Sequence, residues 1–375
     1  MHHSNALDTR FLTRFTECRA VLANPEFLVP DLDWCSANVP DWREHPAADF
    51  FYSSLLGSNG AVHERLRRPV ARACGIRRIT ALHETVEKLT EEHLDDFAEA
   101  TSCGTAANFQ EMVGDPLPVA VAGALIGVPR TDHEQFLRLG RDASRLLEPV
   151  RSPDDWARAD RAVRALREFF TDLLRERRAC PADDLTSALL AQRATDDSPL
   201  TERELVDILL LLFVAGFETT SGMLGLTVFA LLTHPGELAR VRAEPALAAA
   251  AVEESLRWDT PVVMTERIAA RPLDLAPSVT VPEGASVTVV LSAANRDPVQ
   301  HPDPDVFTVG RQGTRVLSFS GGTHFCPGAA LARAEGAALV RRLVDRFPGL
   351  GLAGEPRRRS SVSLRSFDDL PLVTR

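Results

Sequence analysis

One long apolar stretch, Leu205–Leu232, constrains the fold of this chain more than any other feature. Only Asp207 and Glu218 are charged within it. A stretch of this length is either a membrane-spanning helix or the buried axis of a large helical protein. An acid near the centre of a membrane helix is costly in lipid, and more amphipathic helix follows the stretch instead of a basic flank. We therefore expect a buried central helix and no membrane span.

The residues that flank this stretch mark where the helix begins and ends. Thr201 and Glu204 have the spacing of a capping box, in which two side chains satisfy free N–H groups at a helix start. Pro235 cannot continue a helix. The pattern therefore predicts one helix over residues 201–233, roughly 50 Å long.

The rest of the chain divides into helical and strand-like parts. Apolar residues recur every three or four positions over most of residues 61–258, which indicates helices. Short strand-like runs between prolines occupy residues 260–325, and helical character returns at 327–346. This order predicts a mainly α protein with a small β region, an α+β class. Since no Gly/Ser-rich or charged linker separates the parts, we expect residues 1–375 to form a single domain.

A hairpin is expected inside the strand-like part. Val279–Val281 and Ser286–Leu291 flank the sequence Pro282-Glu283-Gly284. Proline fixes one turn dihedral and glycine accepts a positive one, so we predict that these two runs pair across that turn.

Composition excludes several classes of protein. The chain has 52 acidic and 42 basic residues, a formal charge of −10, which repels phosphate backbones and argues against nucleic-acid binding. Its six cysteines form no Cys-x-x-Cys pair, so a disulfide framework or zinc ribbon is not expected. The first 20 residues show no signal-peptide pattern. We expect a soluble cytoplasmic protein.

Polar residues interrupt the most apolar stretch at Gly216 and at Glu218-Thr219-Thr220. Glycine inside a helix costs about 1 kcal/mol relative to alanine. A carboxyl and a hydroxyl beside it indicate a loosened helical turn that holds water and delivers protons into a dry pocket. The alternative is structural: the threonine bonds back to its own helix and the glutamate is paired elsewhere.

A second polar segment, Phe319–Ala329, is rich in glycine. Glycines at 321, 322 and 328 permit close approach of the backbone to a flat group. Pro327 suits the first turn of the helix that follows, which places Cys326 at a helix N-terminus, where a thiolate is stabilised. The thiol is then a nucleophile, a metal ligand or an inert buried group.

Taken together, these segments resemble the cytochrome P450 family of haem-thiolate monooxygenases. Residues 319–328 fit the family's haem loop, with its Phe, Gly, basic residue, ligand Cys and final Gly. Residues 215–220 resemble its oxygen-activating helix motif, and Glu254-x-x-Arg257 resembles its E-x-x-R pair. Residues 294–298 and 13–27 are similar to further blocks of bacterial members. The blocks occur in the family's order, so the resemblance covers residues 13–375.

The resemblance implies a haem b cofactor and assigns residues to it. Cys326 is expected to be the axial iron ligand, with Phe319 packed near its sulfur on the proximal side. His63 and Arg67, one helical turn apart, together with Arg267 are expected to face the haem propionates. His324 is expected to complete that set.

A further set of residues is expected to be structural. By the same resemblance, Glu254 and Arg257 would form an ion network with Arg311 behind the haem.

The sequence departs from the family pattern at two places. Ser320 stands where glycine is commoner, which the fold tolerates if that backbone torsion is ordinary. Only about a dozen residues precede the block Thr13–Phe27, where bacterial members usually have a helix and the first strands. Either the small β region is reduced, or the start of the sequence lies too far downstream.

The implied function is insertion of one oxygen atom from O2 into a mostly hydrophobic organic substrate, by hydroxylation or epoxidation, in bacterial secondary metabolism. Electrons are expected to arrive from a ferredoxin with its reductase, while Glu218 and Thr219 relay protons. The alternatives are a peroxide-using haem enzyme, which typically lacks the acid–Thr pair, and a catalytically silent haem-binding recruitment protein.

Two surfaces complete the expectations. Phe217, Val262–Met264, the segment 36–58 and Ser366–Asp368 are candidates for the substrate pocket, and the substrate arrives either free or tethered to a carrier protein. Residues 61–80 contain six arginines and one acid, a local charge of +6 − 1 = +5. An acidic ferredoxin is expected to dock there.

Overall fold

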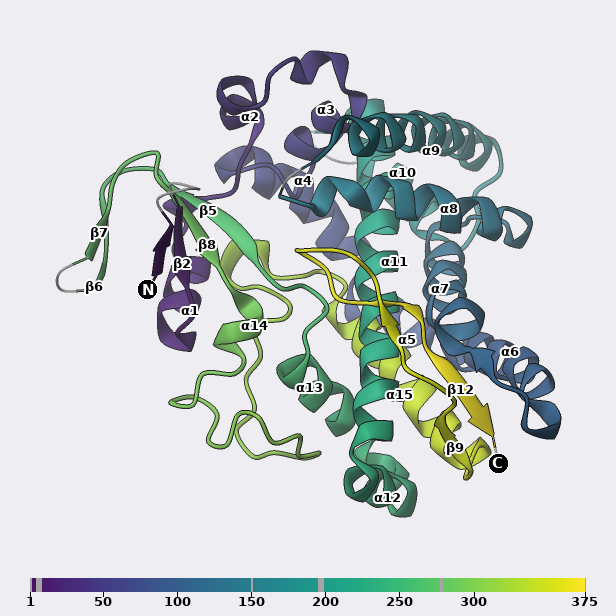
Figure 1. The fold of residues 1–375 in the computed structure, drawn as a ribbon. Helices are drawn as coiled ribbons and strands as arrows, with labels where there is room; N and C mark the ends of the chain where they lie inside the picture. The colour runs from purple at the N-terminus through teal and green to yellow at the C-terminus, as the bar shows by residue number, and fades with distance from the viewer. Residues whose placement is uncertain (1, 5–8, 150, 195–198, 277–278, 375) are drawn as a thin grey trace.

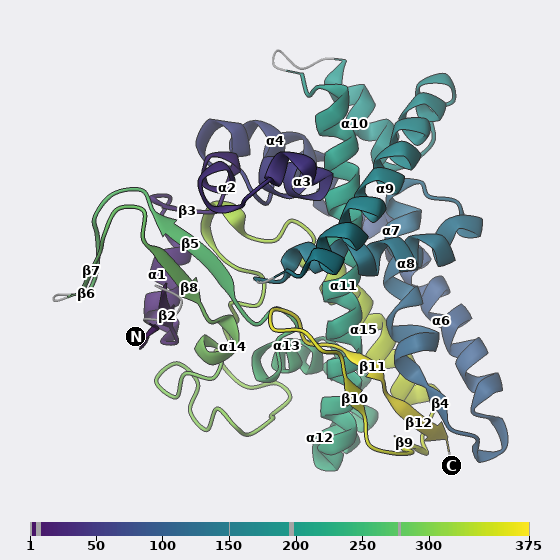
Figure 2. The ribbon, with the colours of Figure 1, turned by 45° about the horizontal axis from the view of Figure 1, so that its top comes forward.

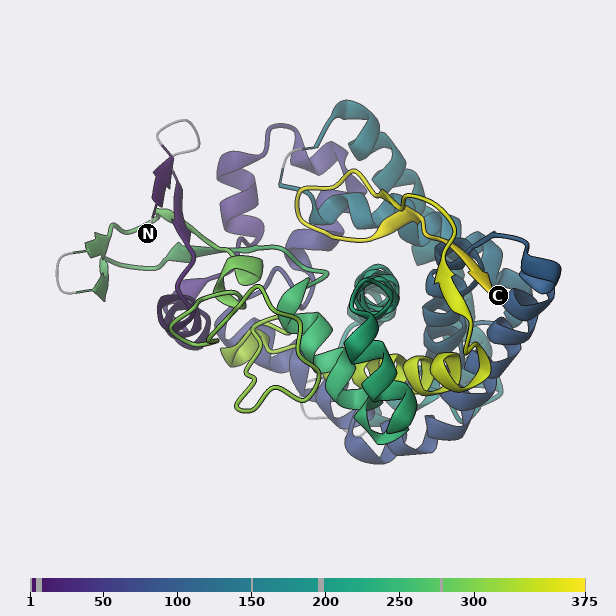
Figure 3. The ribbon, with the colours of Figure 1, turned by 60° about the horizontal axis from the view of Figure 1, so that its bottom comes forward.

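A computed structural model of the chain describes residues 2–4, 9–149, 151–194, 199–276 and 279–374. The predicted long helix, α11 (Glu202–Thr233), runs through the middle of the molecule with other helices around it (Figure 1, Figure 3). Thr201 and Glu204 form the expected capping box: the Glu204 amide donates to the Thr201 hydroxyl, and the Thr201 amide donates to the Glu204 carboxylate. Pro235 begins the next helix, as predicted.

Helix α11 is the buried axis that its composition indicates. Among the described residues, only this helix has the length and apolar character to cross a membrane, and 78% of its most apolar window is buried inside the protein. Its two interior acids are both paired. Asp207 binds Arg167 with Oδ1 2.7 Å from Nε, and Glu218 binds Arg359. Pairing offsets part of the penalty that an isolated charge meets away from water.

Helices account for most of the described chain on both sides of α11. Those before it are α1 (Phe15–Ala23), α2 (Leu32–Asn38), α3 (Pro46–Ser53), α4 (Gly60–Ala73), α5 (Ile76–Ala81), α6 (His83–Ala100), α7 (Pro116–Ile126), α8 (His133–Ala143), α9 (Pro153–Ala179) and α10 (Leu185–Arg193). Those after it are α12 (Pro235–Ala243), α13 (Ala248–Trp258), α14 (Leu291–Ala294) and α15 (Ala329–Arg346). Helices α6 to α9 lie on one side of α11 and the main sheet lies on the other (Figure 1, Figure 2).

The strands form small sheets, so the expected α+β class is confirmed. The largest has the order β1 (His2–Ser4), β2 (Thr9–Leu12), β8 (Ser286–Val289), β5 (Thr265–Ala269) and β3 (Phe27–Leu28). Strands β2 and β8 are parallel, whereas its other pairs are antiparallel. The remaining sheets pair β4 (Ala107–Asn108), β12 (Pro371–Thr374) and β9 (Leu350–Leu352); β10 (Arg357–Arg358) and β11 (Phe367–Asp369); and β6 (Leu273–Ala276) and β7 (Val279–Val281).

Two expectations about the β region were wrong. The turn at Pro282–Gly284 forms, and Gly284 has the positive φ of 74° that it requires. However, β7 pairs with β6 and not with β8. Strand β8 cannot accept β7 because β2 and β5 occupy its two edges. The run Ser286–Leu291 is also shorter than expected, since α14 begins at Leu291. Strands β1 and β2, which precede α1, form one side of the largest sheet.

Two apolar cores meet along α11. Its N-terminal half, including Phe213, packs with Phe136 and Phe170 from α8 and α9. Its C-terminal half, including Leu224, packs with residues of α13 and α15 such as Leu339. Buried apolar area is the main stabilising contribution to folding, and a helix shared by two cores is fixed along its length. The polar residues of α11 are therefore held at defined positions.

Candidate functional site

The Gly-rich segment 319–328 forms a tight loop against α1. The Cys326 amide donates to the Phe319 carbonyl at 3.0 Å, which closes the loop on itself. Gly322 has φ of 62°, and a Cβ there would lie 2.2 Å from the Leu22 carbonyl oxygen. Glycine at 322 is thus required both by its torsion and by the close approach of α1.

Ser320 departs from the expectation of an ordinary torsion. Its φ is 61°, in the left-handed region that favours glycine. A side chain in this region costs about 1–2 kcal/mol. The serine that replaces the commoner glycine is therefore strained, and its hydroxyl oxygen lies 3.5 Å from a guanidinium nitrogen of Arg267.

Cys326 lies just before a helix, as expected, although Pro327 is not in the first turn of that helix as predicted. Helix α15 begins at Ala329 with Gly328 as its cap, so Pro327 precedes the helix. The amides of Gly328 and Ala329 hydrogen-bond to the half-buried thiol and favour its thiolate form. Burial acts in the other direction and is the larger effect, so the pKa of Cys326 is raised in the protein without cofactor. A positive ligand such as a metal ion is needed to hold the thiolate.

Four cationic or titratable side chains gather beside this loop, as expected. His63 on α4 is 3% exposed, and its ring centroid lies 4.2 Å from that of His324. Arg67, one turn further along α4, donates to the Phe325 carbonyl at 2.5 Å. Arg267 on β5 is 3% exposed and donates to the Glu266 carbonyl at 2.7 Å.

These groups have no counter-anion in the described part of the chain. Arg67 and Arg267 pair with no carboxylate there, and burial lowers the pKa of Arg267 to about 10. Burial, then Arg267, His63 and Arg67, lowers the pKa of His324 to about 3. His63 Nε2 is buried without a hydrogen-bond partner among the described residues. A buried charge normally has a partner, so the arrangement fits an anionic group with several acceptor oxygens.

The residues present fit a haem, whose two propionates are such anions. A cleft of about 580 Å³ opens next to them, and Ala61, His63, Glu64, Arg65, Arg67, Arg68 and Thr323 line it. Phe319 is part of the same loop, with its ring 4.3 Å from the Arg333 guanidinium carbon and packed against the core. The structure therefore brings all six residues expected around the cofactor to one region, from α4, β5 and the loop before α15.

The polar turn of α11 follows the structural alternative. The helix is continuous through Gly216, so the expectation of a loosened turn was wrong. The Thr219 hydroxyl donates to the Ala215 carbonyl at 2.7 Å, and Glu218 pairs with Arg359. Glu218 is 3% exposed, and burial, only partly offset by Arg359, raises its pKa.

The expected ion network behind the loop is confirmed. Arg257 binds Glu254 through two contacts of 2.8 Å, and Arg311 Nε lies 3.3 Å from Glu254 Oε1. Arg257 is fully buried and also donates to the Pro304 and Val306 carbonyls, at 2.8 and 3.0 Å. The network fixes the chain that leads into the loop.

Some candidates for the substrate pocket are core residues. Phe217 is fully buried, and its ring stacks 6.2 Å from that of Phe213. Phe367 is also fully buried, so neither side chain faces open space. Asp368 binds Arg357 and Arg359 at 3.0 and 3.2 Å, which leaves it no free charge for a cationic substrate. Val262–Met264 are half-buried and stay candidates.

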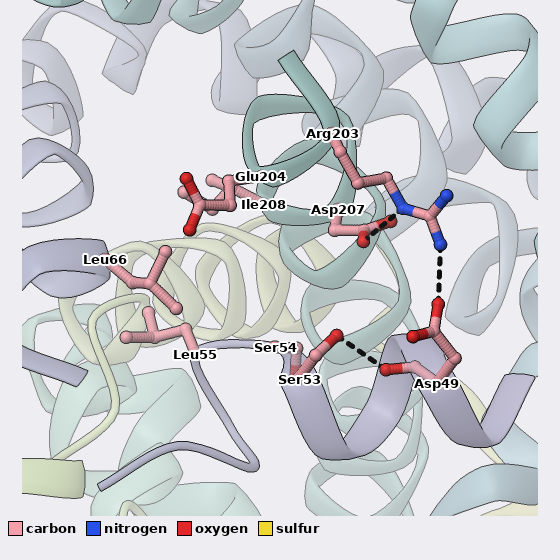
Figure 4. A pocket seen from close by; sticks show the side chains of 9 residues that line it. All are labelled: Asp49, Ser53, Ser54, Leu55, Leu66, Arg203, Glu204, Asp207 and Ile208. Atoms are coloured by element: carbon pink, nitrogen blue, oxygen red, sulfur yellow. Dashed lines mark hydrogen bonds and ion pairs between the residues drawn. The ribbon is translucent and has the colours of Figure 1, made fainter. Parts of the chain in front are cut away.

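The segment 36–58 contributes to a charged cleft of about 410 Å³ (Figure 4). Asp49 on α3 lies 2.6 Å from Arg203, which also binds Asp207. Every acid that lines the cleft is paired with an arginine. The charged side chains share the lining with Leu55, Leu66 and Ile208, so the cleft is part charged and part apolar.

Two of the six arginines in the segment 61–80 are neutralised. Arg65 binds Glu204, and Arg78 lies 3.2 Å from Asp183. Their charges are therefore not available to the ferredoxin expected to dock on this segment. Arg68, Arg72 and Arg77 are exposed.

Sequence analysis missed several polar residues near α11. Asp115, Arg141 and Arg359 form a charged cluster with Glu218. On α15, Glu335 is 4% exposed, burial raises its pKa, and its Oε2 has no partner among the described residues. No local motif marks these residues. The partners of Asp115, Arg141 and Arg359 come from distant segments of the chain.

Comparison with known proteins agrees with this geometry. A family model described as "Cytochrome P450" matches residues 53–350. The 6-deoxyerythronolide B hydroxylase of Saccharopolyspora erythraea is 38% identical over 97% of this chain and 90% of that protein. Cytochrome P450 monooxygenase PikC of Streptomyces venezuelae is 36% identical over 91% of this chain and 79% of that protein. The crystal structure of P450BioI with a hexadec-9Z-enoic acid ligated acyl carrier protein superposes with a TM-score of 0.90, at 30% identity, covering 97% of this chain and 92% of that one.

Proposed function

The chain belongs to the cytochrome P450 family of haem monooxygenases, and on that premise we propose that it inserts one oxygen atom of O2 into a polyketide-type secondary metabolite. The observation that supports this most directly is the thiol of Cys326 beside the buried His63 and Arg267 and the half-buried Arg67 and His324, which have no counter-anion among the described residues. The substrate class is supported by two relatives: one is named a hydroxylase of 6-deoxyerythronolide B, and another, 33% identical over 86% of this chain, is named a polyketide biosynthesis cytochrome P450.

We assign the haem-binding roles as follows. The family's iron takes a cysteine thiolate, and Cys326 is the ligand in this chain. The propionates would be held by a set of side chains that gather beside the loop and lack another anion in the described chain: His63, Arg67, Arg267 and His324. Phe319 packs on the proximal side, where its carbonyl receives the Cys326 amide.

Bound haem supplies the redox chemistry that activates O2 with two electrons and two protons, so that one oxygen atom enters a C–H or C=C bond of the substrate and the other leaves as water. The chain's own residues provide the protons. Glu218 and Thr219 are adjacent on α11, and the carboxyl has one oxygen without a partner among the described residues. A positioned acid of raised pKa suits proton transfer near neutral pH.

The electrons arrive singly from a ferredoxin that is reduced by its own reductase. We place this partner on the exposed arginines of α4 and α5, close to the Cys326 loop. The exposed apolar side chains Val62 and Phe325 lie in the same region, at the start of α4 and next to Cys326. Interfaces commonly combine an apolar centre with a charged rim. We propose that the protein works in the cytoplasm, where both partners are supplied.

The substrate reaches the site as a free macrolactone-like molecule or on a carrier protein, and the test distinguishes the two. Purified protein is incubated with a surrogate ferredoxin, its reductase and ¹⁸O2. The substrate is either a free macrolactone or the corresponding ring-opened acyl chain on an acyl carrier protein. Incorporation of one ¹⁸O atom is expected. Product with hydrogen peroxide alone, and none with O2 and ferredoxin, would identify a peroxide-using enzyme instead. No product under either condition despite a bound haem would indicate a silent haem protein.

A further inference from the structure

Glu218 has one carboxylate oxygen bound and the other free. Its Oε1 accepts a hydrogen bond from the Arg359 guanidinium, whereas its Oε2 is buried without a partner in the described chain. The side chain is 3% exposed. A buried carboxylate oxygen without a donor is costly, so it is expected to have a role that needs it free.

Arg359 bridges several acids at this position. Its Nη2 lies 3.4 Å from Asp115 Oδ2 and its Nε lies 3.2 Å from Asp368 Oδ1, in addition to the contact with Glu218. Asp115 is 1% exposed and also binds Arg141. Arginine stays protonated in proteins, so Arg359 cannot itself pass protons along. It can only orient its acidic neighbours and set their charge.

The segment that carries Arg359 is fixed to the segment that precedes β5. The Arg359 amide donates to the Ser366 carbonyl at 3.0 Å, which closes a loop between β10 and β11. Within that loop, the Ser363 carbonyl accepts from the Val263 amide at 2.8 Å. Arg358 and Arg365 bind Asp259 at 2.8 and 2.7 Å. Arg359 is thus anchored from both sides and holds Glu218 at a defined place.

Among the described residues, the charged groups beside Glu218 come from three separate parts of the chain. Arg359 lies just after β10, Arg141 is on α8, and Asp115 caps α7. Burial raises the pKa of Glu218, Arg359 lowers it, Asp115 raises it and Arg141 lowers it. Arg359 is the largest of the influences that favour the ionised carboxylate.

We infer that Arg359 is the positioning residue of Glu218: it holds one carboxylate oxygen, leaves the other free to take up a proton, and so fixes where that proton is received. This inference rests on the proposed role of Glu218 as a proton relay. Arg359 does not touch substrate or cofactor in this scheme. It acts on the reaction through Glu218, while its contacts with Asp115 and Asp368 fix its own position.

The test measures the protonation of Glu218 directly in the haem-loaded protein. The infrared band of protonated carboxyl groups is followed against pH, and Glu218→Gln identifies the part that belongs to Glu218. In Arg359→Gln the midpoint of that band should move up by about one pH unit or more, because the guanidinium that favours the carboxylate is gone. Arg359→Lys keeps the charge and should lie closer to the original midpoint. Arg357→Gln is the matched control, since Arg357 shares Asp368 but has no contact with Glu218.

The outcomes separate the inference from the proposed function. An unchanged midpoint in Arg359→Gln, or an equal shift in Arg357→Gln, overturns the positioning role. If Arg359→Gln loses haem or unfolds, the midpoint is measured in Arg359→Met, which removes the same charge with an apolar side chain. An upward shift there supports the positioning role, and an unchanged midpoint overturns it. If Glu218→Gln keeps full coupling, the relay in the proposed function is wrong, whatever the band shows.

Discussion

A guanidinium nitrogen of Arg267 lies 3.5 Å from the hydroxyl oxygen of Ser320. Each of these two residues is energetically unfavourable in the folded protein, for a different reason. Arg267 is a buried cation without an acidic partner in the described chain, and Ser320 is a side chain in a left-handed torsion. Both costs are borne by the protein without cofactor. A site prepared for an anion has this character, because the cost is offset only when the ligand binds.

Replacement of Arg267 by methionine should therefore have opposite effects with and without haem. In the haem-free chain, removal of an unpaired buried charge should raise the free energy of unfolding by about 1 kcal/mol. Haem affinity should fall by at least about 30-fold, since a buried propionate loses its partner. Thermal unfolding and haem titration measure the two effects.

The control for this substitution is Arg271→Met, at an exposed arginine that binds Glu26. It should leave haem affinity unchanged. A loss of stability in haem-free Arg267→Met would show that Arg267 has a partner other than the cofactor.

Ser320→Gly should stabilise the protein. Glycine adopts a positive φ without the steric cost that serine meets, and it loses more backbone entropy on folding, so the net gain is expected to be about 0.5–1 kcal/mol. Urea unfolding of the haem-free protein is the measurement. Ser318→Gly, at a neighbouring position without a positive φ, should destabilise, because its hydroxyl donates to the Leu256 carbonyl at 2.8 Å.

Parts of the fold were accessible from sequence because local rules determine them. The capping box and Pro235 define the ends of α11, and both features act within a few residues. The loop before α15 was recognised by the same kind of local spacing. The partners of β7 and β8 were not, since strand pairing depends on which segments the rest of the fold brings alongside.

The cluster around Glu218 shows the same limit at the candidate site. Glu218 stands out in sequence as an acid in an apolar helix, yet its partner Arg359 is 141 residues further along the chain. Arg359 itself lies in a run of three arginines with no motif that singles it out. The acid was therefore predictable, whereas the residue that holds it was visible only in three dimensions.

Cys326→Ala should abolish the absorption band of the reduced, carbon-monoxide-bound protein that gives the family its name. That band requires a thiolate on the iron, and Cys326 is the thiol that the loop places at the site. Cys74→Ala is the control, because Cys74 is half-buried at the end of α4 and outside the loop. Survival of the band in Cys326→Ala would show that the assignment of the ligand is wrong.

Thr219→Ala and Glu218→Gln should leave substrate binding nearly intact and divert electrons to hydrogen peroxide. Both side chains act on protons, after the substrate has bound. Product formation should fall by roughly 10²-fold or less, the usual contribution of one positioned proton donor. The ratio of product to electrons consumed is the measurement. Thr227→Ala is the control, since its hydroxyl also bonds back to its own helix, to the Met223 carbonyl at 2.7 Å.

We expect an acidic ferredoxin to dock on the exposed arginines of α4 and α5. Arg65 and Arg78 are excluded from the docking face because each binds an acid of this chain. Arg72 and Arg77 are exposed, so Arg72→Glu and Arg77→Glu should slow the first electron transfer by about 10-fold at low salt through a slower encounter. The difference from the unmodified protein should shrink as salt is added, since charges are screened beyond about 8–10 Å at physiological ionic strength.

Haem content and substrate affinity should stay unchanged in both variants, because neither arginine contacts the Cys326 loop. Arg67→Glu should behave differently and lose haem, since Arg67 donates to the Phe325 carbonyl at 2.5 Å beside the ligand. Arg161→Glu, at an exposed arginine of α9, controls for a general change in net charge. Stopped-flow reduction at several salt concentrations separates these effects. The three variants change the net charge equally and differ only in the position of the charge. If Arg72→Glu and Arg77→Glu slow reduction no more than Arg161→Glu does, the ferredoxin docks on another face.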